Sequence, residues 1–274
     1  MDCIVGVDIG HSTNGKATTG IVVLESKTQK VRLAAAIPSN EIGCRLSEIL
    51  EDGDKIVTAV IDGPLAAPQF LEKQRLCERF FSCGVFASTG KECRKLRLQP
   101  APTKAGGRFH VAATRVAEML KLPPFSVPAF HLCAPIQPSI IEIFPTVFMA
   151  SLLPPQRYEG IRSAHTDYLW AELLKCNDGK PMPVLQPYEE LVQRVESLTS
   201  KRAKHEVRAA AICAIAAHAI SSHKPLGFIG TNKEQGFLLP GTRDGNGWMN
   251  DEFRGLLEHA WNTRPDTRQE LQWM

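Results

Sequence analysis

Cys3-Ile4-Val5-Gly6-Val7-Asp8 and Lys55-Ile56-Val57-Thr58-Ala59-Val60-Ile61-Asp62 are two stretches, far apart in the chain, that both end in an aspartate. Their β-branched and apolar residues predict strands that are buried on both faces. Turn-forming residues follow each aspartate, so each strand is expected to end there.

Two more strands are expected between these stretches, at Thr19–Leu24 and Val31–Ile37, followed by a helix at Ile42–Leu50. Three strands joined by short links suggest an antiparallel meander. A meander that leads into a helix and then a parallel strand places this fourth strand beside the first. We therefore predict an α/β fold whose mixed sheet, an antiparallel meander followed by parallel strands, is flanked by helices.

The rest of the chain continues with strands and helices. Strands are expected at Ser139–Phe144, Gly227–Gly230 and Gly236–Pro240. Helices are expected at Gln69–Phe81, Val111–Leu122, Tyr188–Thr199, Arg202–Ser222, which is rich in alanine, and Asp251–Trp261. We expect a single domain over residues 1–274, with a basic loop insertion near 84–104 and a mixed helical insertion near 150–200.

The composition is that of a globular protein: of 274 residues, 43 % are apolar and 22 % are charged. A net charge of +3 is too small to indicate nucleic-acid binding by itself. The eight cysteines form no Cys-x-x-Cys pair, which argues against a zinc ribbon. We expect no secretory leader, no membrane span and a cytoplasmic location, because the most apolar helix, Ala209–Ile220, is too short for a bilayer.

The two aspartates predict a metal site. Ligands of such sheets lie at the carboxyl ends of neighbouring parallel strands, where Asp8 and Asp62 are expected. Two carboxylates side by side repel each other, so one must be protonated or a cation must bridge them. With Glu142 from a further strand, three acids could hold Mg²⁺ or Mn²⁺ for phosphoryl displacement. Taken singly, each acid could equally be a turn, capping or edge-strand residue.

Basic residues offer possible substrate contacts. Arg75 and Arg79 lie one helical turn apart and could bind phosphate, although an ion-paired helix surface is the alternative. Lys95 belongs to a basic segment, Lys91–Lys104, that could contact nucleic acid or be a surface loop. His11 could assist proton transfer or be a solvated loop residue.

Five motifs resemble those of the domain-of-unknown-function family 429, whose members are described as predicted nucleases of ribonuclease H-like fold. They are Val5-Gly6-Val7-Asp8, Val60-Ile61-Asp62-Gly63-Pro64-Leu65, Arg75-Leu76-Cys77-Glu78-Arg79, Ile141-Glu142-Ile143-Phe144-Pro145 and Glu234-Gln235-Gly236-Phe237-Leu238-Leu239-Pro240. They occur in the order of the family and span most of the chain. The resemblance implies a ribonuclease H-like domain in which Asp8, Asp62 and Glu142 bind metal.

The chain departs from the family pattern at the start of the late alanine-rich helix. The family has an aspartate followed by alanine there, whereas this chain has Arg208. Glu206 lies two residues earlier, on a different side of a regular helix. Either Glu206 replaces the acid as a catalytic residue, or the fourth ligand is absent and Arg208 takes the place of a cation or binds phosphate.

Three functional hypotheses follow. The first is a metal-dependent nuclease, a phosphodiester hydrolase acting on nucleic acid. The second is a non-catalytic nucleic-acid-binding or scaffold protein that kept the fold. The third is an ATP-binding phosphotransferase of the actin-like and sugar-kinase class, because residues 6–14 look like the first phosphate loop of those proteins.

Overall fold

A computed structural model describes residues 1–10, 18–65, 75–82, 84–86, 96, 98, 107–122, 139–159, 161, 166–231, 235–263 and 271–273. The contacts divide the chain into two compact units. The first unit comprises Met1–Leu65, Arg108–Ile143 and Pro183–Lys224, and the second comprises Ala66–Gly107, Phe144–Met182 and Pro225–Met274. The expectation of a single domain did not include this division, which interleaves segments that are distant in the sequence.

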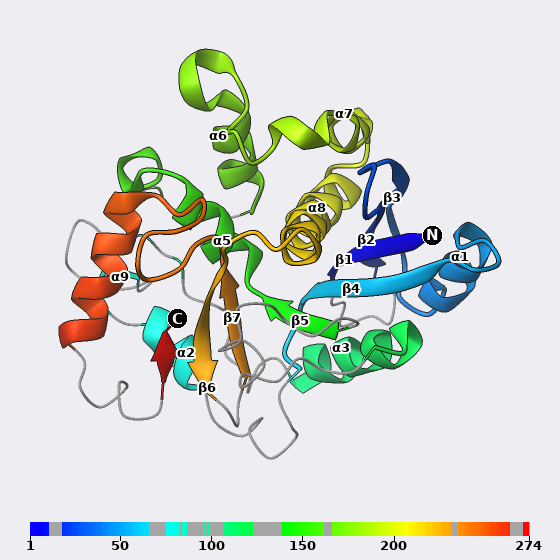
Figure 1. Cartoon of the computed structure of the whole chain (residues 1–274), viewed down its shortest axis with the longest axis horizontal. Coiled ribbons are helices and arrows are strands. Elements are labelled where there is room, and N and C mark those ends of the chain that lie inside the picture. Colours follow the sequence, from blue (N-terminus) through cyan, green and yellow to red (C-terminus); the bar gives the residue numbers. More distant parts are fainter. Residues whose placement is uncertain are drawn as a thin grey trace. The chain divides into compact units, whose positions relative to one another are not determined.

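The first unit is built on a five-stranded mixed sheet (Figure 1). Its strands are β1 (Asp2–Asp8), β2 (Thr18–Glu25), β3 (Val31–Pro38), β4 (Lys55–Asp62) and β5 (Ser139–Ile143), in the spatial order β3-β2-β1-β4-β5. β1, β2 and β3 pair antiparallel, whereas β4 pairs parallel to both β1 and β5. The mixed α/β sheet and the position of the fourth strand beside the first are therefore confirmed.

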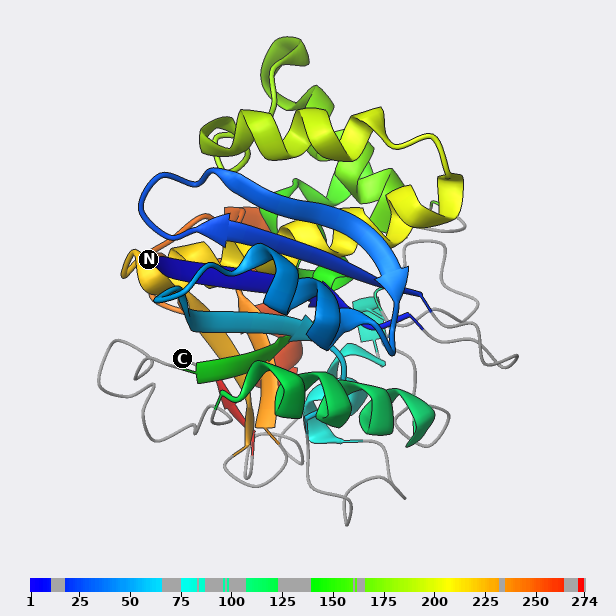
Figure 2. The same cartoon turned by 90° about the vertical axis from the view of Figure 1, so that its right-hand side faces the viewer.

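Helices cover both faces of this sheet (Figure 2). α1 (Ile42–Ile49) and α3 (Gly107–Leu120) share one apolar cluster with alternate residues of the strands, such as Val5, Val7 and Ile61. α8 (Lys201–Ser221) lies on the other face, with α7 (Glu189–Ser197) and the short 3₁₀ helix η4 (Gln186–Tyr188) next to it. Because strand residues alternate between faces, Gly6 and Asp8 of β1 point towards α8.

α8 approaches the sheet closely because the contact is made by glycine and alanine. A β-carbon on Gly6 would lie 2.2 Å from the Ala210 carbonyl oxygen and 2.2 Å from the Ala214 nitrogen. On Gly20 of β2 it would lie 2.2 Å from the Glu206 carbonyl oxygen. The alanine-rich sequence of α8 predicts such close packing, and the sheet provides two glycines to receive it.

Gly6→Ala is therefore expected to destabilise the protein by about 3 kcal/mol, because the added methyl group meets helix backbone that has no room to move aside. Urea unfolding of the variant and the wild type measures this cost. Gly255→Ala is the control: it lies inside a helix of the second unit with nothing within 4 Å of an added β-carbon, and it should stabilise by about 0.5–1 kcal/mol. An unchanged unfolding free energy of Gly6→Ala would contradict the close contact.

The second unit has its own three-stranded sheet in the order β7-β6-β8. Its elements are α2 (Leu76–Phe81), η2 (Gly84–Phe86), α5 (Pro145–Leu152), η3 (Pro155–Arg157), α6 (Thr166–Gly179), β6 (Gly227–Thr231), β7 (Gln235–Leu239), α9 (Asp251–Thr263) and β8 (Gln272–Trp273). The two final strands expected from the sequence are confirmed. Neighbouring aromatic rings, among them Phe80, Phe86 and Phe253, fill its core.

Two helices begin several residues away from the expected positions. The helix expected from Val111 begins at Gly107. The helix expected from Gln69 begins at Leu76, because Arg75 has extended backbone angles and serves as the N-cap residue. Residues 66–74 lie outside the described part of the chain. Among the helices of the described residues, none has the length and apolar character needed to cross a bilayer.

Candidate functional site

Asp8 and Asp62 meet at the carboxyl ends of two adjacent parallel strands of the first unit. They are direct register partners of β1 and β4, so both side chains point to the face covered by α8. Adjacent strands lie only about 4.8 Å apart, which brings the two carboxyl groups within reach of each other. The two carboxyl groups interact strongly, and each affects the pKa of the other. Two carboxylates this close repel each other, which favours the protonated form of one of them.

The surroundings of this pair disfavour negative charge. Burial raises the pKa of Asp8 well above its usual range, and the charge of Asp62, the hydrogen bond to Asp62 and the charge of Glu206 raise it further. Burial raises the pKa of Asp62 to about 7; the hydrogen bond with Asp8 opposes this rise, and the charge of Glu142 adds to it. The pair therefore retains a proton at pH values where exposed aspartates have lost theirs.

Glu206 is the acid that α8 brings to this end of the sheet. Its side chain is buried, with 6 % of the residue exposed. The Thr18 hydroxyl donates to its Oε1 at 2.7 Å, and Arg202 Nε donates to the same oxygen at 3.1 Å. Its other oxygen, Oε2, is buried and has no hydrogen-bond partner in the described part of the chain. Gly20 lies against the Glu206 backbone, so α8 is close enough to the sheet to bury the Glu206 side chain.

Glu142 lies close to the pair but on the other face of the sheet. It is the register partner of Ile61, one residue out of phase with Asp62. Its Oε2 accepts a hydrogen bond from the Leu65 backbone N–H at 3.3 Å. The expected convergence of three strand acids is thus replaced by two strand acids and a helix acid on one face, with Glu142 acting on Asp62 through its charge.

Arg208 faces away from Glu206, because two residues of an α-helix are about 200° apart around its axis. Its guanidinium binds Glu196 of α7, with Nη2 at 2.9 Å from Oε1 and 3.1 Å from Oε2. Of the two alternatives left open by the sequence, this geometry favours Glu206 as the acid that accompanies Asp8.

The other basic residues singled out in the sequence belong to the second unit. Arg75 is 2 % exposed, its Nε lies 2.8 Å from Glu78 Oε1, and its guanidinium lies 5.4 Å from the centre of the Phe237 ring. Arg79 is exposed. The two arginines therefore differ in environment, and Arg75 belongs to a buried ion pair. Lys95 and His11 lie outside the described residues, as do residues 11–14 of the expected phosphate loop.

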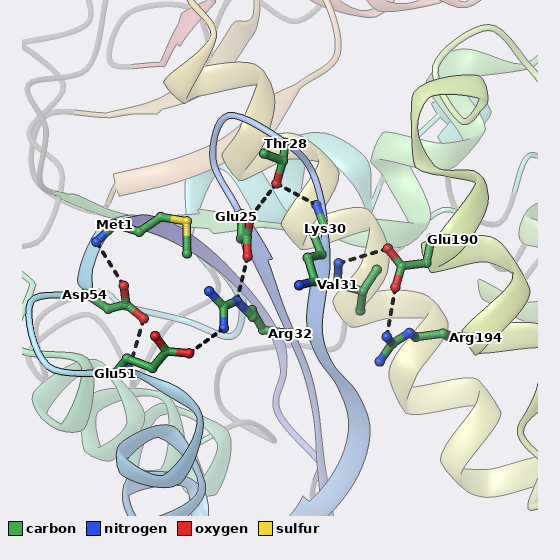
Figure 3. A network of polar contacts seen from close by, with 10 residues as sticks. All are labelled: Met1, Glu25, Thr28, Lys30, Val31, Arg32, Glu51, Asp54, Glu190 and Arg194. Atoms are coloured by element: carbon green, nitrogen blue, oxygen red, sulfur yellow. Dashed lines mark hydrogen bonds and ion pairs between the residues drawn. The ribbon is translucent and has the colours of Figure 1, made fainter.

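Acids at the opposite end of the same sheet have cationic partners (Figure 3). Arg32 Nε lies 2.7 Å from Glu25 Oε1, and the Met1 amine lies 2.9 Å from Asp54 Oδ1. The hydrogen bond from Thr28 and the charge of Arg32 lower the pKa of Glu25, and the hydrogen bond from the Met1 amine lowers the pKa of Asp54. The raised pKa values of Asp8 and Asp62 are thus a local property of the carboxyl end.

Thr18, Arg202 and Cys213 are residues of this site that the sequence analysis missed. The spacing of Arg202 and Glu206, four residues apart on one helix, is a signal that would have found that pair. The Thr18 contact spans 188 residues and has no local signal. Cys213 is buried against the Val7 and Asp62 backbone, and burial together with the charges of Asp62 and Asp8 raises its pKa well above its usual range.

The chemistry of the three acids on the α8 face suits a hard divalent cation, which prefers carboxylate oxygens. The buried, unpartnered Oε2 of Glu206 would gain a ligand interaction there. Within the described residues, however, no group of three or more His, Cys, Asp or Glu side chains is arranged so that it could hold a metal ion. The three acids would have to move closer together, and a proton retained by Asp8 or Asp62 would have to leave, before a cation could bind.

Comparisons of the chain with protein-family models, curated protein sequences and solved structures found no match.

Proposed function

We propose that the chain is a metal-dependent phosphodiester hydrolase acting on nucleic acid, and that its five-stranded unit is ribonuclease H-like. The observation that carries the proposal is the in-register pair Asp8 and Asp62 with Glu206 of α8 on the same face. The strand order β3-β2-β1-β4-β5 and the motif resemblance to the nuclease family support the same conclusion.

Asp8, Asp62 and Glu206 Oε2 are the groups that would hold Mg²⁺ or Mn²⁺. Such an ion, when bound, polarises a phosphodiester and lowers the pKa of a water molecule that can attack it. Asp8 and Asp62 provide the negative charge for this site once both are deprotonated. Glu206 contributes Oε2, which is buried and receives neither of the two hydrogen bonds that Oε1 accepts.

Exposed cations near Glu206 support a polyanionic substrate. Lys201 and Arg202 are exposed in the first turn of α8, within five residues of Glu206. Positive side chains beside a cleavage site bind phosphates independently of base sequence. This arrangement favours nucleic acid as the substrate class without selecting DNA or RNA.

Cleavage of labelled DNA and RNA with Mg²⁺ or Mn²⁺, and with EDTA as the metal-free control, tests the proposal. Glu206→Gln should reduce metal-dependent cleavage by about 100-fold or more, because it removes a ligand charge. Glu142→Gln should reduce it by less than about tenfold, because Glu142 lies on the other face of the sheet and affects Asp62 through its charge. Equal losses in the two variants would contradict the assignment of Glu206, and no metal-dependent cleavage by the wild type would contradict the proposal.

A further inference from the structure

The two carboxylate oxygens of Glu206 differ in their hydrogen bonds. Both of its hydrogen-bond donors, the Thr18 hydroxyl at 2.7 Å and Arg202 Nε at 3.1 Å, bind Oε1. Oε2 is buried without a partner within the described residues. A buried carboxylate oxygen without a partner is costly, so a ligand bound at Oε2 would remove that cost.

The two donors come from different places and differ in exposure. Thr18 is the first residue of β2, next to β1, whereas Arg202 lies one turn before Glu206 on α8, with a side chain that is 57 % exposed. A hydroxyl on a strand of the sheet is a fixed donor, while a long exposed arginine is a mobile one. Thr18 therefore contributes most to the orientation of Glu206.

We propose that Thr18 is a positioning residue: its hydroxyl holds Glu206 Oε1 and leaves Oε2 directed to a divalent cation shared with Asp8 and Asp62. This role rests on the proposed function, since it assigns Glu206 as a ligand. Hydrogen bonds to the outer oxygen of a ligating carboxylate fix its direction, and their loss typically weakens metal binding by about 10–100-fold.

The same strand provides a matched control. Thr19 is also buried and also makes one hydroxyl hydrogen bond, to Ser39 at 2.7 Å. Successive strand residues point to opposite faces, so its hydroxyl is directed away from Glu206. Thr19→Val thus removes a comparable hydrogen bond from the same strand without touching the site.

The test is Mn²⁺ binding to the full-length chain, measured by titration calorimetry and by the loss of the free-ion electron paramagnetic resonance signal. Thr18→Val should weaken Mn²⁺ binding about tenfold or more, and Thr18→Ser, which restores the hydroxyl, should stay within about threefold of the wild type. Thr19→Val should bind Mn²⁺ within about twofold of the wild type even where it unfolds more easily. If Thr18→Val does not fold, Thr18→Ala is measured in its place.

The outcomes separate the two proposals. Equal Mn²⁺ affinities of Thr18→Val and the wild type, or equal losses in the Thr18 and Thr19 variants, would overturn the positioning role while leaving the metal site in place. A wild type that binds no Mn²⁺ would overturn both. Mn²⁺ binding that depends on the Thr18 hydroxyl, in a protein that cleaves no nucleic acid, would support the positioning role and remove only the nuclease.

Discussion

Asp62→Asn is expected to lower metal-dependent cleavage of nucleic acid by about 1000-fold or more, since it removes a central charge from the proposed cation site. Asp8→Asn should have a similar effect, because the two residues are register partners and each affects the pKa of the other. Their double variant should be scarcely worse than either single variant, since groups that act as one unit are not additive. Single-turnover cleavage rates at saturating Mg²⁺ measure these losses.

Asp54→Asn is the matched control for this prediction. It removes the same charge from the residue just before β4, at the opposite end of that strand, where Asp54 pairs with the Met1 amine (Figure 3). Its cleavage rate should lie within about twofold of the wild type, because distant sites act independently. A wild-type rate in both Asp62→Asn and Asp8→Asn would eliminate the proposed site, and a large loss in Asp54→Asn would show that the assay reports folding instead.

The metal-free protein is expected to lose stability as the pH rises from about 5 to about 8, by an amount on the order of 3 kcal/mol from the Asp8 and Asp62 pair. The pKa of Asp62 is raised to about 7 in the folded protein, so the folded state binds the proton more tightly than the unfolded chain does. The contribution is fully present below the usual aspartate pKa. It is lost progressively as the pH rises through the folded pKa.

Chemical unfolding of the wild type and Asp62→Asn, at several pH values in EDTA, measures this contribution as a difference. Groups elsewhere, such as Glu25 and Asp54 with lowered pKa values, have the opposite dependence and cancel in that difference. Asp62→Asn should gain stability relative to the wild type as the pH rises, and Mg²⁺ or Mn²⁺ should restore the wild type at about pH 8. A difference that is independent of pH would mean that the pair is ionised in the folded protein.

Local sequence patterns predicted much of the first unit correctly. β1 and β4 were recognisable from their apolar stretches, and their final aspartates marked the strand ends because turn-forming residues follow. The alanine-rich sequence of α8 predicted a close approach to a sheet. The helix start at Leu76 was not predictable in the same way. The sequence before it is compatible with a helix, and the start is set by the extended backbone of Arg75.

The second unit was not predicted because its parts are separated along the chain. β6 and β7 were recognised as strands, but their sheet is completed by β8, two residues at the far end. Three interleaved segments make up each unit, and strand pairing between distant segments leaves no local signal.

The sequence by itself determined that Asp8 and Asp62 stand at the ends of neighbouring strands, because strand ends and sheet order follow from local pattern and chain connectivity. Only the tertiary structure decided which acids accompany them. In the β4–β5 register Glu142 pairs with Ile61 and not with Asp62, which places it on the other face, and the crossing of α8 over Gly20 brings Glu206 to Asp8. Register and helix placement depend on contacts between residues far apart in the chain, such as Thr18 and Glu206.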